Sequence, residues 1–390
     1  MNKVLIYSLL LIVGLLGSQF LPHWFDALWD SASLILRLAT MTALAFIMIH
    51  VGYEFEIDRS RPKDLAVDYG VAATAAAFPW IFVALYFVFV LAPERAWQDL
   101  ESWKPALLAG RFAAPTSAGV LFSMLAAAGL SATWVFRKAR VLAIFDDLDT
   151  VLLMIPLKML MVGMRWQMAV IIVIMFSQLW LAWRYFRRLR WSVRWPAVMI
   201  YSAGIVAVSE VLYQASKLVD DVVPIHVEVL LPAFVLGCVL ARPAGSDPHT
   251  DDVREGHQEG PEDEIEQKVS GIVSGVFMVL VGLGMPVIAT IMTENDRGWG
   301  VIAVHVLLVT VLANLGKMFP VFVYRTEASL RERLAVSIGM WPRGEVGAGV
   351  LILSLSYGIS GPMIVVAALS LALNLVLTGV FIAMVKRLIR

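Results

Sequence analysis

Long apolar runs, separated by short polar stretches, follow one another along the chain from its first residues to its last. A helix that spans a bilayer needs about 20 mostly apolar residues, and windows of that size divide the chain into about twelve segments. The predicted segments are residues 2–20, 31–52, 64–92, 105–130, 139–163, 166–186, 195–217, 222–241, 264–292, 298–324, 328–357 and 361–388. Continuous runs of this length predict an all-α, polytopic membrane protein, because a membrane β-barrel would show short, alternating segments instead.

The composition agrees with this pattern. Hydrophobic residues make up 59% of the 390 positions and charged residues 16%, and the mean hydropathy is +0.78, far from the values of a soluble domain. The 31 basic and 31 acidic residues cancel, which argues against a nucleic-acid partner. Cys238 is the single cysteine, so a disulfide framework and a cysteine-based metal or nucleophile site are excluded. We therefore expect no enzyme and no cofactor.

Lysines and arginines are unevenly divided between the two sets of loops. Most fall on one side, and the basic residues of the other side are Arg95, Lys104, Arg165, Lys217 and Arg297. Because positive loops stay in the cytoplasm, this bias predicts an even number of spans with both termini cytoplasmic. The longest loop, residues 242–263, is acidic and rich in proline and glycine, and we expect a flexible cytoplasmic connector there.

Three acids interrupt the apolar run of the fifth segment: Asp146, Asp147 and Asp149. A charge at membrane depth costs at least about 2.5–3.5 kcal/mol, so acids there indicate a functional site. Two adjacent carboxylates in a low dielectric cannot easily both ionise, which couples their protonation to the arrival of a cation. Asp149 shares a helical face with Asp146 and belongs to the same polar cluster on this interpretation. The competing interpretation is that the acids cap a helix start near the surface.

Lys317 lies in the tenth segment among apolar residues, together with Asn314 and His305. A buried lysine needs a carboxylate partner or loses its proton, and Asp146 or Asp147 is the candidate. The alternative is a lysine that extends to the nearby cytoplasmic interface. His305 and Asn314 are expected to make ordinary hydrogen bonds between helices.

Two segments have the composition of interrupted helices. The fourth contains Pro115, Thr116, Ser117 and Gly119, and the eleventh contains the run 339–349 with Pro342 and several glycines. Freed backbone groups at the ends of half-helices are a usual way to build an ion site in a transporter. We take the two segments as equivalents in two repeats, residues 1–163 and 222–390, joined by linking helices at 164–221. Within the second break, Arg343 and Glu345 are expected to pair with each other or with nearby acids.

Four stretches resemble the monovalent cation/proton antiporter superfamily, and most of all the bacterial sodium/proton exchangers with two adjacent aspartates. The stretches are 114–120 (APTSAGV), 138–147 (KARVLAIFDD), the Gly316–Lys317 pair and 339–347 (GMWPRGEVG). The resemblance implies one transporter unit over residues 1–390, with inverted repeats, two crossed interrupted helices and a separate dimerisation domain. It also implies a homodimer in a bacterial cytoplasmic membrane that works by elevator-like alternating access. We expect no regulatory nucleotide-binding domain.

The resemblance also assigns roles to residues. Asp147 would carry the cation and the proton, Asp146 would pair with Lys317, and Thr116 and Ser117 would line the crossing. The residues themselves, apart from the resemblance, make Asp149, Asn314, Arg343 and Glu345 the expected supporting residues of the site. The exchange would couple two protons to one Na⁺, with Li⁺ and K⁺ as other candidate cations.

The chain departs from the family's pattern at Phe145, at the additional acid Asp149, and at His226 and Glu228 of the eighth segment. These departures leave open a relative with altered transport that acts as a channel or as a signalling or effector protein. A sodium-coupled organic-anion symporter on the same architecture is a further alternative. An intramembrane aspartyl protease fits badly, because its two aspartates must face one water from different helices.

Overall fold

The computed structural model describes residues 2–24, 26–55, 62–92, 96–163, 165–219, 229–241, 264–287 and 299–389. Each of the twelve predicted segments has a helical counterpart in this described part. Eight of the described helices are long and apolar enough to cross a membrane, and two shorter apolar helices lie at Leu230–Val239 and Val346–Leu355. The prediction of an all-α membrane protein is therefore confirmed.

The contacts within the chain divide it into two compact units. Unit 1 comprises Met1–Leu36, Ser60–Met161 and Met278–Arg390, and unit 2 comprises Arg37–Arg59 and Val162–Phe277. Unit 1 takes its helices from both predicted repeats, so the compact units are not the repeats. The repeat boundaries themselves stay a prediction.

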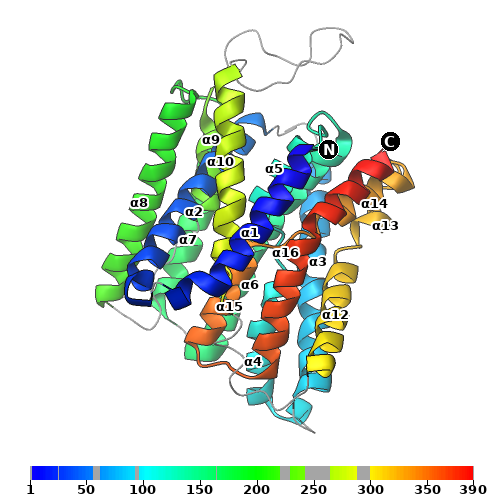
Figure 1. Ribbon diagram of the computed structural model, residues 1–390. Helices are drawn as coiled ribbons and strands as arrows, with labels where there is room; N and C mark the ends of the chain where they lie inside the picture. Colours follow the sequence, from blue (N-terminus) through cyan, green and yellow to red (C-terminus); the bar gives the residue numbers. More distant parts are fainter. Residues whose placement is uncertain are drawn as a thin grey trace. The chain divides into compact units, whose positions relative to one another are not determined.

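Unit 1 holds the helices from both ends of the chain. The helices of unit 1 are α1 (Asn2–Trp24), α3 (Pro62–Tyr86), α4 (Leu100–Gly110), α5 (Ala118–Ala127), α6 (Trp134–Val162), α12 (Trp299–Gly316), α13 (Pro320–Val323), α14 (Leu330–Gly339), α15 (Glu345–Ser356) and α16 (Pro362–Ile389). The start of α1 and the end of α16 lie at the same end of this unit, and the two helices pack together (Figure 1). This arrangement agrees with termini on one side of the membrane.

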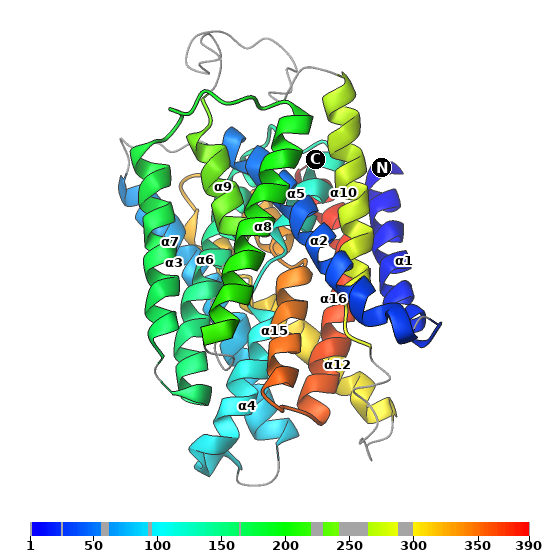
Figure 2. The same cartoon turned by 90° about the vertical axis from the view of Figure 1, so that its left-hand side faces the viewer.

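Both predicted helix interruptions are present. The helix α4 continues through a 3-10 turn, Arg111–Ala113, and the chain is then non-helical until α5 begins at Ala118. Residues 340–344 separate α14 from α15 in the same way. Pro115 and Pro342 have no backbone N–H to donate, and Ser117 caps the N-terminus of α5 by accepting from the N–H of Val120. In Figures 1 and 2, α4 and α15 extend toward one end of unit 1, and α5 and α14 extend toward the other.

The tenth segment differs from the prediction of a continuous helix. The helix α12 ends at Gly316, and a turn follows before the single turn of α13 begins at Pro320. Proline cannot donate the hydrogen bond that would continue α12, whereas it is well suited to a first helical position. Lys317 is therefore the first residue of this break.

A close backbone contact fixes the end of α12. The helix packs along α3, and a Cβ atom at Gly316 would lie 2.4 Å from the backbone nitrogen of Pro79. Only glycine fits this approach, since real Cβ atoms do not come so near. The fit holds the start of the Lys317 turn against α3.

In its described residues, unit 2 contains α7, α8 and α9 and most of α2 and α10. The bounds are α2 (Asp26–Glu54), α7 (Trp166–Arg184), α8 (Trp195–Val219), α9 (Leu230–Val239) and α10 (Glu264–Leu283). The helices α2 and α9 cross through Gly52 and Gly237, where added Cβ atoms would each lie 2.2 Å from a carbonyl oxygen of the other helix. Arg37 of α2 and Glu210 of α8 form an ion pair of 2.8 Å. His226 and Glu228, two of the departures from the family's pattern, lie outside the described residues.

Gly316→Ala is expected to force α12 away from α3. Overpacking of this kind lowers the free energy of unfolding by about 1–3 kcal/mol, so the apparent Tm of the purified protein in detergent should fall. Gly349→Ala is the control, because nothing lies within 4 Å of a Cβ at that helical position and alanine favours helix. Equal Tm values for the two variants would contradict the proposed fit.

Candidate functional site

The three acids of the fifth segment lie deep inside α6. The helix starts at Trp134, so Asp146 lies about three turns beyond its first residue. Asp146, Asp147 and Asp149 have 0%, 6% and 3% of their surface exposed. The interpretation as caps of a helix start is therefore wrong, and the acids form a buried cluster.

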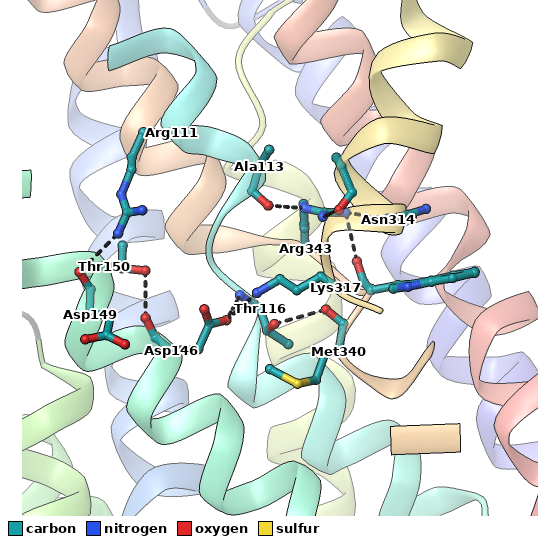
Figure 3. Close-up of polar contacts among 12 residues, drawn as sticks. Arg111, Ala113, Thr116, Asp146, Asp149, Thr150, Asn314, Lys317, Met340 and Arg343 are labelled. Atoms are coloured by element: carbon teal, nitrogen blue, oxygen red, sulfur yellow. Dashed lines mark hydrogen bonds and ion pairs between the residues drawn. The ribbon is translucent and has the colours of Figure 1, made fainter. Parts of the chain in front are cut away.

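Asp146 and Lys317 form an ion pair that is closed off from solvent. Lys317 Nζ donates to Asp146 Oδ2 over 2.7 Å, and both side chains are 0% exposed. The same carboxylate oxygen accepts from the backbone N–H of Thr116 over 2.8 Å. A lysine that extends to the interface is therefore wrong. The carboxylate joins α6, the first break and the turn after α12 (Figure 3).

The two helix breaks contact each other directly. The backbone N–H of Ser117 donates to Pro342 O over 3.0 Å, and Thr116 Oγ1 donates to Met340 O over 3.0 Å. Thr116 and Ser117 thus lie at the crossing. The hydroxyl of Thr116 and the backbone N–H of Ser117 satisfy carbonyl oxygens of the second break. Such irregular backbone is tolerated in a membrane protein only where other protein groups satisfy it.

Arg343 is a fully buried cation at the crossing. Its Nε donates to Ala113 O over 2.9 Å and its Nη2 to Ala313 O over 2.8 Å. Its Nη1 donates to the side-chain oxygens of Asn314 and Asn374, over 2.7 and 3.2 Å. We predicted that Arg343 pairs with Glu345 or with nearby acids, whereas these partners are carbonyl and amide oxygens. The side chain of Glu345 lies outside the described residues.

The charges match the ends of the half-helices. Ala113 O and Ala313 O belong to the carboxyl-terminal ends of the α4 segment and of α12, where carbonyl groups carry partial negative charge and a cation is favourable. Asp146 accepts from the N–H of Thr116, just before the first turn of α5, where partial charge is positive. Buried cation and anion therefore each face a helix end of opposite sign.

Sequence reasoning missed Arg111, which lies in the 3-10 turn after α4 and is 0% exposed. Its Nη2 donates to the backbone oxygen of Asp149 over 3.0 Å, and its guanidinium lies 4.9 Å from the centre of the Trp80 ring. Tyr69 donates its hydroxyl to Asp149 Oδ1 over 2.9 Å. Arg111 is charged and lies within the predicted fourth span, so the rule that found Lys317 would have found it as well.

Asn374 of α16 was also missed, because its only signal is a lone amide in a long apolar run. Two other predicted residues are placed by the structure. Asp147 lies on α6 directly after Asp146 and is 6% exposed. His305 makes the expected bond between helices, 2.7 Å from the hydroxyl oxygen of Tyr86, outside the cluster.

Comparison with known proteins decides the family. The family model described as "Sodium/hydrogen exchanger, transmembrane" matches residues 3–387. The chain belongs to the sodium/hydrogen exchanger family. No curated protein matches the chain.

One similar solved structure is the sodium proton antiporter MjNhaP1 from Methanocaldococcus jannaschii at pH 8. It shares 15% sequence identity with this chain, with a TM-score of 0.56, and the match covers 98% of this chain and 91% of MjNhaP1. At this identity the likeness shows the fold. The resemblance to the cation/proton antiporter superfamily is therefore confirmed for this member of the exchanger family.

Lys317→Gln is expected to destabilise the protein strongly, by about 3–5 kcal/mol, because it leaves the Asp146 charge buried without its cation. Asp146→Asn leaves the Lys317 charge buried without its anion, and we expect a similar loss of stability. The double variant removes both charges and should lose much less stability than the two single losses added together.

A denaturant titration of the four proteins in detergent measures this coupling. Arg37→Gln and Glu210→Gln are the control pair, because their side chains are 37% and 20% exposed and such pairs contribute little. The control losses should be small and nearly additive. Additive losses at Asp146 and Lys317 as well would contradict a coupled buried pair.

Proposed function

We propose that the protein exchanges protons for a monovalent cation, with Na⁺ as the first candidate and Li⁺ and K⁺ as the others. The observation that carries the proposal is the buried pair of Asp146 and Lys317, which meets the crossed breaks beside Asp147. Membership of the sodium/hydrogen exchanger family and the antiporter fold support the same class of activity.

The balance of buried charge supports coupling between the two ions. Among the described side chains around the crossing, the three carboxylates of α6 and three basic groups, Lys317, Arg111 and Arg343, are buried. A protonated Asp147 carries no charge, so a monovalent cation that displaces this proton leaves the net charge of the six groups unchanged, whereas a cation that binds without displacing it adds one uncompensated charge. In a low-dielectric interior such a charge is costly unless a proton leaves. On this argument, cation binding requires the release of a proton.

Asp147 is the carboxylate that we assign to the transported ions. Oδ2 of Asp146 already accepts from Lys317 and from the N–H of Thr116, which gives Asp146 a fixed, positioning role. The hydroxyl of Thr116 is bonded to Met340 O, so the two breaks are held together beside α6, and interrupted helices of this kind are a usual place for a cation site. Asn314, Arg343 and Asp149 support this arrangement, and Glu345 joins them on the sequence alone.

Alternating access by movement of unit 1 is the mechanism that we propose. Every described site residue named above belongs to this unit, which gathers the crossing and its charges into one compact body. The proposal includes a homodimer in a bacterial cytoplasmic membrane, both termini on the cytoplasmic side, no cofactor, and electrogenic exchange of two protons for one cation.

Phe145 bears on the alternative of a relative with altered transport. Its ring lies 5.5 Å from that of Tyr69, edge to face, and Tyr69 in turn bonds Asp149. Two of the departures from the family's pattern thus form one local cluster beside the site. Transport measurements distinguish a working exchanger from a channel, a signalling protein or an organic-anion symporter.

Asp147→Asn is expected to abolish cation-dependent proton movement, because the amide holds neither the proton nor the cation charge. The measurement is proton flux in proteoliposomes with an internal pH-sensitive dye, after addition of Na⁺, Li⁺ or K⁺. Asp99→Asn is the matched control, since Asp99 is exposed and caps α4, a role that asparagine keeps. Folded wild type without response to any of the three cations would overturn the proposal.

Electrogenic exchange predicts a response to voltage. With no pH gradient, moving one net charge per cycle across a potential of 100 mV releases about 2.3 kcal/mol. This free energy corresponds to an equilibrium Na⁺ gradient of about 50-fold. A potassium diffusion potential set with valinomycin and the distribution of ²²Na⁺ measure it. Electroneutral exchange would leave the ²²Na⁺ distribution unchanged.

A further inference from the structure

The connection between α7 and α8 carries five arginines within eleven residues: Arg184, Arg187, Arg188, Arg190 and Arg194. No acidic residue occurs from position 150 to position 209. The nearest acidic residue of the two helices that it joins is Glu210 of α8, which pairs with Arg37. We call residues 183–195 the arginine loop.

The arginine loop has a fixed backbone. Leu189 pairs with the chain after α9, because its N–H donates to Val239 O over 2.9 Å and its oxygen accepts from Ala241 N over 2.8 Å. The N–H of Arg187 donates to Cys238 O over 2.9 Å, and its Nη2 donates to Phe55 O over 3.3 Å. One arginine thus anchors the loop within unit 2.

The other four arginines are exposed. Three exposed tryptophans accompany them: Trp191, 53% exposed, lies between Arg190 and Arg194, and Trp183 and Trp195, 44% and 37% exposed, flank the four arginines. Tryptophan side chains gather at the level of the lipid headgroups, where the ring is half in lipid and half in water. Exposed arginines flanked by exposed tryptophans are expected of a surface at this depth.

The helices on both sides place the loop at that level. The exposed residues of α7 and α8 include large apolar side chains such as Val173, Phe176, Ile200 and Val211, as expected of surfaces that face hydrocarbon. The arginines follow directly where these apolar surfaces end. Guanidinium groups bind phosphate with two parallel hydrogen bonds, and clusters of four or more basic residues beside a spanning helix attract anionic lipids.

We propose that the arginine loop is a binding surface for the headgroups of anionic phospholipids, with Arg184, Arg188, Arg190 and Arg194 as the phosphate ligands. The binding is separate from ion exchange and does not depend on it. A second possible occupant is the acidic stretch 242–263 of the same chain, which begins next to Ala241. The lipid is favoured because the tryptophans and the apolar helix surfaces adjoin the arginines.

The experiment titrates phosphatidylglycerol, labelled in its acyl chain, into the full-length protein in detergent, with phosphatidylcholine of the same chains as the neutral probe. Wild type should bind phosphatidylglycerol at least tenfold more tightly than phosphatidylcholine. Replacement of the four arginines by glutamine should remove this preference, and replacement by lysine should keep a part of it.

The control carries four other exposed arginines changed to glutamine, Arg137, Arg325, Arg331 and Arg387, all in unit 1. It should keep the preference of wild type, with an unchanged elution volume and apparent Tm in every variant. Equal preference in wild type and in the loop variant overturns the proposal. A second result also overturns the proposal: a preference for phosphatidylglycerol that arises only after the acids of 242–263 are neutralised. In that case the acidic stretch 242–263 occupies the arginine loop.

Discussion

The contact between the two helix breaks is the constraint on which the rest of unit 1 depends. Broken backbone in a membrane protein must find partners, and here each break supplies them to the other: Ser117 to Pro342, Thr116 to Met340, and Arg343 to Ala113. These bonds join parts of the chain more than 200 residues apart. They also fix where the ends of four half-helices point, and therefore where buried charge is tolerated.

Charge placement follows from those ends. Arg343 donates to carbonyl oxygens at helix ends, and the Asp146 carboxylate accepts from the backbone N–H of Thr116 before α5. Each buried ion therefore compensates a partial charge of opposite sign. Lys317, in the turn after α12, supplies the positive charge that pairs with Asp146. Gly316 lets the backbone at the start of this turn approach α3. On the proposed function, structural pairing and ion chemistry share one set of groups.

Much of this was predictable from local signals. Prolines marked both breaks, and charges in apolar runs marked Asp146 and Lys317, because membrane insertion makes each such residue costly. The pairing of Arg343 was not predictable, since its acceptors Ala113 and Asn374 come from distant helices. Pro320 was present in the sequence, but within an apolar run it reads equally well as a kink, and only packing shows that α12 ends before it.

The order of synthesis limits when the buried ion pair can form. Asp146 precedes Lys317 by 171 residues, and at about 5–20 residues per second the ribosome needs roughly 10–30 s to reach the lysine. During that interval the Asp146 carboxylate lacks its cation partner Lys317. The Asp146–Lys317 pair can therefore form only after residue 317 of the 390 has been synthesised, late in the biogenesis of this protein.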